Sequence, residues 1–318
     1  MAKEFEKRES ISSNIDIQYQ NLLEDIIQNG IESADRTGTG TKKVFGRFLK
    51  LDLSDGFPLL TTKKVWFKGV KEELLWFMAG ERNIRPLVLK DVNIWNEWPF
   101  QKYLAKNELE SQFPKYSPEW KGEMANFVGK IKENKEFADQ WGDLGPVYGY
   151  KWRHWKTRDG GEIDQLANAI ELIKHNPDNR RIIVSAWNPE DIQDVALPPC
   201  HLLFQFQVAQ DKLNCGMYQR SVDTFLGLPF NIASYGLLTE LLAKITDKKP
   251  GEVTLFLGDA HLYLNHIEFA KEQLKREPRP LPKLNLNPNI TTLENIFSEG
   301  IVVENYNPHP TIKAPISV

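Results

Sequence analysis

The sequence predicts an α+β fold, in which helices pack on a mixed, largely antiparallel sheet. Residues 15–30 and 230–245 have the apolar spacing typical of helices, and the second stretch is the most apolar helical segment of the chain. Residues 182–187, 202–208 and 253–258 are short apolar runs typical of strands. Neither an internal repeat nor a low-complexity segment interrupts this pattern.

The remaining elements follow in chain order. Residues 1–14 are polar and predict a flexible N-terminal arm, and the first helix ends at Gly30, a residue suited to a helix C-cap. Residues 35–41 are rich in turn formers, residues 44–53 predict a strand, and residues 70–79 predict a second helix. The stretch 99–141 is rich in Lys, Glu and aromatic residues and predicts a small helical insertion within a single domain, residues 15–318.

Composition argues against several classes of protein. The chain has 318 residues and a formal net charge of −3, so it offers no basic surplus for binding nucleic acid. No apolar run approaches the roughly 18 residues of a membrane span, and no apolar signal core follows the charged start. Two cysteines make a disulfide framework unexpected. We therefore expect a reduced, soluble, cytoplasmic protein.

Cys200 is a candidate nucleophile. It follows Pro198 and Pro199, which restrict the backbone, and it precedes the polar residue His201. A buried structural thiol is an equally good interpretation from local sequence alone. A reactive thiolate needs a nearby cation to lower its pKa, and Arg220 could supply that charge. The other cysteine lies in a strand-like run, where a structural role is favoured.

Several arginines indicate an anionic ligand. A guanidinium fork matches phosphate oxygens, and a neighbouring serine hydroxyl adds a donor. The candidates are Arg36, Arg180, Arg181 and Arg220 with Ser221, although each alone is more often a solvated surface charge. The glycine-rich loop around Arg36 lacks the Gly-Lys-Ser/Thr that would follow in a Walker motif.

Proton transfer has its own candidates. Glu73 adjoins apolar residues of the second predicted helix, and burial would raise its pKa, although a surface glutamate is an equal alternative. His261 and Tyr263 share a side if residues 258–266 are extended, whereas His261 and Asn265 share a face if they are helical. The chain has neither an HExxH nor a Cys-x-x-Cys motif, so we expect no metal.

Over residues 16–318 the chain resembles the classical, folate-dependent thymidylate synthase family. The resemblance rests on many blocks in family order: Asp35-Arg36-Thr37-Gly38-Thr39-Gly40-Thr41, residues 56–64, Ile94-Trp95-Asn96-Glu97-Trp98, residues 180–188, Pro199-Cys200-His201, Gln219-Arg220-Ser221 through Asn231, Gly258-Asp259-Ala260-His261 and Ile312-Lys313-Ala314-Pro315. It implies reductive methylation of dUMP to dTMP, with 5,10-methylenetetrahydrofolate as carbon donor and reductant, to give dihydrofolate.

The resemblance also implies roles for individual residues. Cys200 would add to C6 of the pyrimidine, Asn231 would bind the pyrimidine edge, and Glu73 and Tyr148 would assist removal of the C5 proton. The implied dUMP-binding set is Arg36, Arg180, Arg181, Arg220, Ser221, Asp223, Asn231, His261 and Tyr263. The implied folate-binding set is Lys63, Ile94, Trp95, Leu197, Asp223 and Ser317. Family members are homodimers that pair through the sheet and share their sites, with Arg180 and Arg181 reaching into the partner's site.

The chain departs from the family pattern at some positions, and rival functions must be compared with the one that the resemblance implies. Glu81-Arg82 replaces the usual Asp-Thr, and Ser317 replaces a small apolar residue. A deoxyuridylate hydroxymethylase shares the first steps, whereas a cytidylate-specific relative would carry Asp in place of Asn231. A cysteine hydrolase would need His201 as a base, but neighbouring residues of a strand point to opposite faces. An RNA-binding regulator gains no support from the net charge.

Overall fold

The computed structural model describes residues 14–35 and 38–315 and divides the chain into two compact units. The first unit contains the residues up to Val65, Val208–Asn287 and the residues from Ile301 onward. The second contains Trp66–Gln207 and Pro288–Gly300. The chain passes between them within strand β6 (His201–Ala209). The predicted arm, residues 1–14, lies outside the described residues except for Asn14, which caps the first helix.

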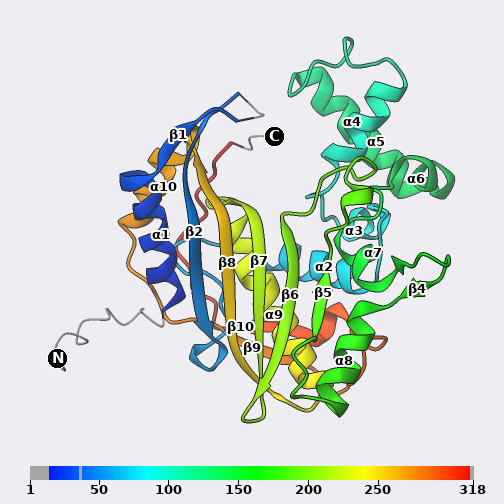
Figure 1. The fold of residues 1–318 in the computed structure, drawn as a ribbon. Helices are drawn as coiled ribbons and strands as arrows, with labels where there is room; N and C mark the ends of the chain where they lie inside the picture. The colour runs from blue at the N-terminus through cyan, green and yellow to red at the C-terminus, as the bar shows by residue number, and fades with distance from the viewer. Residues whose placement is uncertain (1–13, 36–37, 316–318) are drawn as a thin grey trace. The chain divides into compact units, whose positions relative to one another are not determined.

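Four strands of the first unit run side by side in the order β1 (Ile31–Ser33), β2 (Thr41–Asp52), β8 (Lys249–Tyr263) and β7 (Lys212–Asp223) (Figure 1). The pairs β1/β2 and β2/β8 are antiparallel, whereas β7 and β8 are parallel. The predicted mixed, largely antiparallel sheet is thereby confirmed. Strands β2 and β8 are longer than the apolar runs that predicted them, because their outer residues alternate between buried and exposed positions.

Helices α9 (Leu228–Ile245) and α1 (Ile15–Asn29) cover this sheet, and α10 (Ile267–Leu274) packs on α1. Helix α9 packs on β7 and β8, and α1 packs on β2. Most residues of α9 are buried, as expected for a helix that is apolar on all sides. A side chain at Gly236 would come within 2.5 Å of the Pro58 ring, so glycine permits this close approach. The unit is completed by η1 (Leu53–Asp55), η3 (Leu264–His266) and the antiparallel pair β9 (Lys283–Leu286) and β10 (Ile301–Glu304).

The second unit is mainly helical. Strand β5 (Ile183–Ser185) pairs antiparallel with β6, and β3 (Trp155–Lys156) pairs with β4 (Glu162–Ile163). The other elements are α2 (Phe67–Met78), α3 (Arg85–Leu89), α4 (Glu97–Lys106), α5 (Pro118–Glu133), α6 (Lys135–Trp141), α7 (Tyr148–Arg153), α8 (Gln165–His175), η2 (Pro189–Asp191) and η4 (Ser298–Gly300).

Helices α4, α5 and α6 occupy the stretch where the sequence predicts a helical insertion. They pack through aromatic side chains: Phe127 of α5 lies with its ring centroid 5.4 Å from that of Phe100, 5.3 Å from Tyr103 and 5.6 Å from Phe137. Phe100 and Phe127 are fully buried. The stretch therefore has a small apolar core built from its own side chains.

Candidate active site

In the first unit, the polar candidates gather where strands β7 and β8 end. Because these strands are parallel, their carboxyl ends meet at the same edge of the sheet. The register places Ser221 opposite Asp259 and Asp223 opposite His261. His261 is extended rather than helical, and its ring centroid lies 5.5 Å from that of Tyr263. The pairing of His261 with Tyr263, one of the two alternatives left open by the sequence, is the one that the structure has.

Backbone hydrogen bonds fix the turn after β7. The N–H and Oγ1 of Thr224 donate to the carbonyl oxygen of His261 over 2.9 and 2.6 Å. Oδ1 of Asp223 accepts the N–H groups of Phe225 and Leu226. These two hydrogen bonds hold the carboxylate in one orientation. Because Asp223 is half-buried, part of the side chain still reaches the surface of the unit.

Asn231 lies in the first turn of α9 and is oriented by Gln219. The Gln219 amide nitrogen donates to Oδ1 of Asn231 over 3.1 Å, and Gln219 is only 3% exposed. With its oxygen engaged in this way, Asn231 has its amide N–H groups to offer to a ligand. Sequence reasoning did not single out Gln219, and its one signal was its place next to Arg220 and Ser221, both half-buried in β7.

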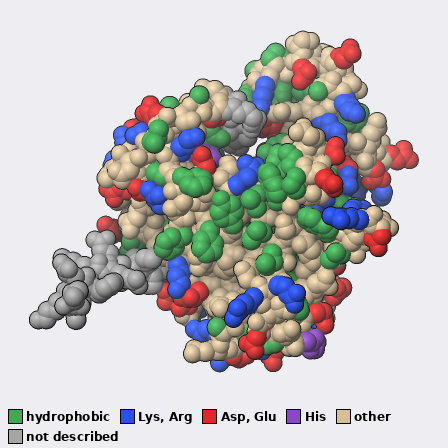
Figure 2. Space-filling model, in the orientation of Figure 1, with side chains coloured by type: hydrophobic (Ala, Val, Ile, Leu, Met, Phe, Trp, Pro, Cys, Tyr) green, Lys and Arg blue, Asp and Glu red, His purple; other side chains and the backbone are tan. Residues whose placement is uncertain are grey.

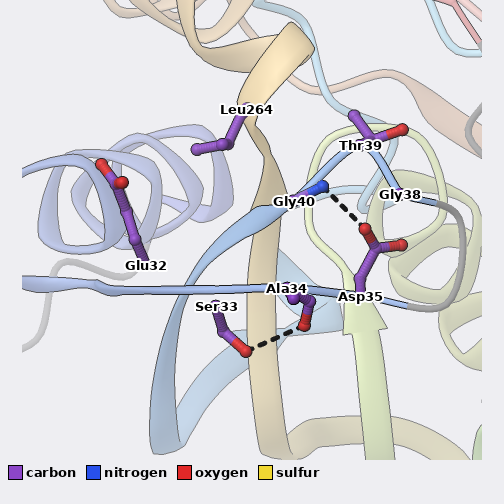
Figure 3. Close-up of a pocket in the computed structure, with 8 residues that line it drawn as sticks. All are labelled: Glu32, Ser33, Ala34, Asp35, Gly38, Thr39, Gly40 and Leu264. Atoms are coloured by element: carbon purple, nitrogen blue, oxygen red, sulfur yellow. Dashed lines mark hydrogen bonds between the residues drawn. The ribbon is translucent and has the colours of Figure 1, made fainter.

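A pocket of about 390 Å³ lies beside the glycine-rich loop (Figure 3). Within the loop, Oδ1 of Asp35 accepts the N–H of Gly40 over 2.7 Å, and the carbonyl of Gly40 accepts the N–H of Leu264. The loop is therefore attached to the end of β8. Arg36, the predicted phosphate ligand of this loop, lies outside the described residues. The pocket is lined by Glu32, Ser33, Ala34, Asp35, Gly38, Thr39, Gly40 and Leu264.

Lys63 is buried in the first unit, with 6% of its surface exposed. Its Nζ donates to the carbonyl of Phe225 and lies 3.6 Å from the centroid of the Phe225 ring. Burial lowers the pKa of Lys63 to about 7, against the opposing attraction of the Asp223 carboxylate. The sequence predicts a contact with the glutamate tail of a folate, and the side chain would have to leave Phe225 to make it.

In the second unit, Cys200 lies immediately before β6 and is half-buried. Its backbone N–H donates to the hydroxyl of Tyr148 over 2.8 Å. Tyr148 begins α7 with a φ of 22°, a backbone conformation that is uncommon outside glycine. Strained backbone of this kind is often found at functional sites, because the surrounding structure must stabilise it.

Glu73 of α2 is a carboxyl group in apolar surroundings. Trp95 Nε1 donates to its Oε1 over 2.8 Å, and burial raises the pKa of Glu73 to about 7 despite this hydrogen bond. Glu73 keeps some exposed surface and is half-buried, whereas the neighbouring Glu72 is only 5% exposed. Hydrogen bonds from Lys90 and Ser298 outweigh the effect of burial on Glu72 and lower its pKa. The pKa values of two adjacent carboxyl groups on one helix are thus shifted in opposite directions, as expected where one of them moves protons.

Burial makes His201 a weak base and Cys215 a weak acid. His201 is 7% exposed, its ring stacks 4.1 Å from that of Tyr148, and burial lowers its pKa to about 3. A base this weak cannot hold the proton of a thiol near neutral pH, which argues against a cysteine hydrolase. Burial raises the pKa of Cys215 to about 12, so this thiol stays protonated.

The remaining predicted residues differ in exposure. Arg180 and Arg181 both point to solvent, and their segment is fixed by hydrogen bonds from Gln205 to the Arg180 carbonyl and from the Arg181 N–H to Asn179. Ile94 and Leu197 are half-buried apolar side chains, whereas Trp95 is buried. Ser317 lies outside the described residues.

One departure from the family pattern has a structural explanation. Arg82 forms a two-pronged ion pair with the carboxylate of Asp143 and lies 5.1 Å from the centroid of the Tyr150 ring. This pairing raises the pKa of Arg82 and lowers that of Asp143. The arginine therefore connects the segment after α2 to the segment before α7, within the second unit.

Residues 14–35 and 38–315 offer neither a cluster of metal ligands nor a membrane-spanning helix. These residues contain no group of three or more His, Cys, Asp or Glu side chains that could hold a metal ion. No helix among them combines the length and apolarity required to cross a membrane.

The chain is similar to known proteins over almost its whole length. Residues 17–318 match the family model described as Thymidylate synthase. A protein named "Thymidylate synthase" from Listeria monocytogenes serotype 4a (strain HCC23) is 50% identical over 312 residues, which is 95% of this chain and 99% of the relative. A protein of the same name from Listeria innocua serovar 6a (strain ATCC BAA-680 / CLIP 11262) is 51% identical over the same shares of each chain.

Proposed function

The chain belongs to the thymidylate synthase family, and we propose that Cys200 is the nucleophile of its reaction. The protein is a methyltransferase that converts dUMP to dTMP. 5,10-Methylenetetrahydrofolate, the co-substrate, supplies both the one-carbon unit and the hydride and leaves as dihydrofolate. The single observation that carries the assignment of Cys200 is the contrast between the two thiols: Cys215 is buried with a pKa of about 12, whereas Cys200 is half-buried at the start of a strand.

The proposed first step is addition of the Cys200 thiolate to C6 of the pyrimidine. A bond forms between Sγ and C6, and the electron pair of the C5–C6 double bond moves toward O4. The amide N–H of Asn231 is suited to stabilise this developing negative charge, because Gln219 already occupies the amide oxygen. An N–H donor also suits the O4 of uracil better than the amino group of cytosine, so the same contact supports dUMP as substrate.

Glu73 and Tyr148 are the proposed groups for moving the C5 proton. A carboxyl group with a pKa of about 7 is populated in both protonation states at neutral pH, which suits proton transfer in either direction. The hydroxyl of Tyr148 is held by the N–H of Cys200, so it is fixed next to the proposed nucleophile.

Binding of the nucleotide is assigned to the sheet edge of the first unit. His261 and Tyr263 carry groups that can hydrogen-bond a ribose hydroxyl, and Asp223 closes this edge. Arg220 and Ser221 combine a guanidinium with a hydroxyl, which suits a phosphate group, and Arg36 is assigned to the same role. The exposed Arg180 and Arg181 are assigned to the phosphate bound by a second subunit.

The chemistry of several residues fits a folate. Asp223 keeps a partly exposed carboxylate that can accept N–H groups of a pterin, because backbone N–H groups occupy only one side of it. Ile94 and Leu197 present half-buried apolar surface, and Trp95 directly follows Ile94 in sequence. Lys63 is assigned to the glutamate tail, and Ser317 to the C-terminal segment that covers the folate and excludes water from the site.

A homodimer formed through the sheet of the first unit is the proposed assembly. Phe48 and Phe256 are directly paired across β2 and β8, and Phe256 is paired with Tyr218 across β7. Together with Phe45, these side chains are exposed by 37–75%. Figure 2 shows a face of the molecule on which apolar side chains gather. A second copy of the chain would remove this apolar surface from water.

Two further assignments complete the proposal. Residues 15–318 are assigned to one functional domain with a helical insertion at about 99–141, because one family model matches residues 17–318. A chain whose function depends on a reduced thiol suits the reducing environment of the cytoplasm.

The first test replaces Cys200 with Ser. The variant is expected to lose turnover by a factor of at least about 10³, because the hydroxyl is a far weaker nucleophile than a thiolate. Turnover is measured as the absorbance rise of dihydrofolate when dUMP and 5,10-methylenetetrahydrofolate are mixed. Cys215→Ala is the matched control and is expected to keep turnover close to that of the parent. Surviving activity in Cys200→Ser would remove the proposed covalent step.

The second test captures the covalent complex. Incubation with 5-fluoro-dUMP and 5,10-methylenetetrahydrofolate is expected to give a ternary adduct, because fluorine at C5 blocks the proton removal that follows addition. Peptide mass spectrometry is expected to place the adduct on Cys200, and an adduct on any other residue would reassign the nucleophile. Hydroxymethyl product without dihydrofolate in the turnover assay would indicate the hydroxymethylase reaction instead.

A further inference from the structure

The N-terminal part of α1 holds the segment that leads to Lys63. Asp16 is fully buried, and its two oxygens accept four donors: the N–H and Oγ1 of Thr61 and the N–H and Oγ1 of Thr62, at distances of 2.8–3.0 Å. Charge-assisted hydrogen bonds of this kind are stronger than neutral ones. Thr62 directly precedes Lys63, so the carboxylate of Asp16 fixes the position of the backbone that leads into Lys63.

The same helix face holds the turn that follows Asp223. Tyr19 lies three residues after Asp16, which places both side chains on one side of α1. Tyr19 is fully buried, and its hydroxyl donates to the carbonyl of Thr224 over 2.9 Å. Thr224 directly follows Asp223 and also donates to the carbonyl of His261. Tyr19 therefore supports both Asp223 and the backbone of His261.

The two supported segments are also joined to each other. Nζ of Lys63 donates to the carbonyl of Phe225, which is two residues beyond Asp223. Asp16 and Tyr19 of α1, the 61–63 segment and the 223–225 segment thus form one closed circuit of contacts within the first unit. A change at Asp16 reaches Lys63 through Thr62, and a change at Tyr19 reaches Asp223 through Thr224.

We propose that Asp16 and Tyr19 are positioning residues for the folate side of the site. They act through Thr62 and Thr224 on Lys63 and Asp223, and neither has a role in the covalent chemistry. This inference rests on the proposed assignment of Lys63 and Asp223 to folate. It assigns to the buried face of the first helix a specific effect on one of the two substrates, beyond its contribution to stability.

The main experiment replaces Asp16 with Ala and compares the KM values for the two substrates. The KM for 5,10-methylenetetrahydrofolate is expected to rise about 5- to 10-fold, whereas the KM for dUMP changes by less than about twofold, because the 61–63 segment that Asp16 holds contains none of the proposed dUMP ligands. Asp16→Asn keeps an acceptor oxygen and is expected to restore most of the folate KM. Asp25→Ala, on the same helix but paired with Arg47 at its surface, is the matched control and is expected to leave both KM values unchanged.

A double-mutant cycle tests the route of the effect. If Asp16 acts through Lys63, then Asp16→Ala adds little to the folate KM in a Lys63→Met background. Full additivity, or an equal rise of both KM values, would overturn the inference. Lys63→Met alone separates the assignment of Lys63 to folate from the positioning role of Asp16. An unchanged folate KM in that variant refutes the assignment of Lys63 itself.

A second variant keeps the test independent of folding. Circular dichroism and urea unfolding establish whether Asp16→Ala is folded before its kinetics are read. Tyr19→Phe removes one hydroxyl and leaves the ring in place, so it serves if Asp16→Ala does not fold. It is expected to raise the folate KM about 2- to 5-fold, and an unchanged folate KM in a folded Tyr19→Phe protein contradicts the inference.

Discussion

At the scale of single residues, burial shifts an acid and a base in opposite directions toward neutrality. Glu73 has its pKa raised to about 7 and Lys63 has its pKa lowered to about 7, because each is less stable in its charged form when water is excluded. Both residues are assigned to the site. A pKa near neutral pH suits Glu73 to proton transfer. For Lys63, the lowered pKa allows the side chain to be buried without an ion pair to a carboxylate.

The raised pKa of Glu73 predicts how folding stability varies with pH. The folded state holds the proton more tightly than the unfolded state, so the stabilisation is complete below the unfolded pKa of about 4.5 and is lost as the pH rises through about 7. Between pH 5 and pH 8, the free energy of unfolding of the parent is expected to fall by about 2–3 kcal/mol more than that of Glu73→Gln. Urea unfolding at the two pH values checks this.

The turnover of Glu73→Gln tests the proposed role of Glu73 in proton transfer. Glutamine can still accept the hydrogen bond from Trp95, so the structure of the site is retained while the proton is not exchanged. Turnover is expected to fall by about 10²- to 10⁴-fold. Equal pH dependence of stability in parent and variant would mean that the carboxyl group is not desolvated.

Motif residues were the part of the site that could be predicted from the sequence. Cys200 and Asn231 stand in motif blocks and Glu73 stands beside an apolar run, whereas no role was expected of Gln219 or Asp16. Both missed residues act through space: Gln219 contacts a residue 12 positions away and Asp16 contacts residues 45 and 46 positions away. A local pattern cannot show such contacts. It also left open whether Glu73 was buried, because Lys71 and Glu72 beside it suggested a surface position.

At the scale of elements, the α4–α6 helices depend on their own aromatic core. Phe127→Ala is expected to destabilise the protein by about 3–5 kcal/mol, because it removes a fully buried ring that contacts three others. Denaturant unfolding followed by tryptophan fluorescence measures the change. Lys121→Ala, at an exposed position of the same helix, is the control and is expected to stay within about 0.5 kcal/mol of the parent.

Elements with a clear apolar pattern were predicted closely, and elements defined by pairing were not. Helix α1 and helix α9 begin and end within two residues of the predicted bounds. Strand β8 spans Lys249–Tyr263, although only 253–258 had a strand pattern, because its last residues pair with the start of β2. The conformation around His261 was therefore decided by a strand about 200 positions away, which local sequence cannot reveal.

At the scale of the whole molecule, the exposed sheet face predicts self-association. Phe48→Glu is expected to convert the proposed dimer to monomer, because a carboxylate would be buried without a partner in the interface. Turnover is expected to fall with it, because Arg180 and Arg181 are assigned to the partner's phosphate site. Sedimentation velocity measures the state of assembly. Leu89→Glu replaces an apolar side chain of similar exposure in the second unit, and this control is expected to remain dimeric.

The discontinuous make-up of the first unit has a consequence for synthesis on the ribosome. Strand β2 ends at Asp52, but its partner β8 is complete only at Tyr263, so roughly 10–40 s pass between their emergence at elongation rates of about 5–20 residues per second. During that interval the edge of β2 that pairs with β8 has no partner strand, next to Leu49 and Leu51, which are buried in the finished sheet. The second unit is almost continuous in sequence and can fold in the meantime. The nascent chain should therefore recruit holding chaperones through its early β-strand, long after the helices that follow it have folded.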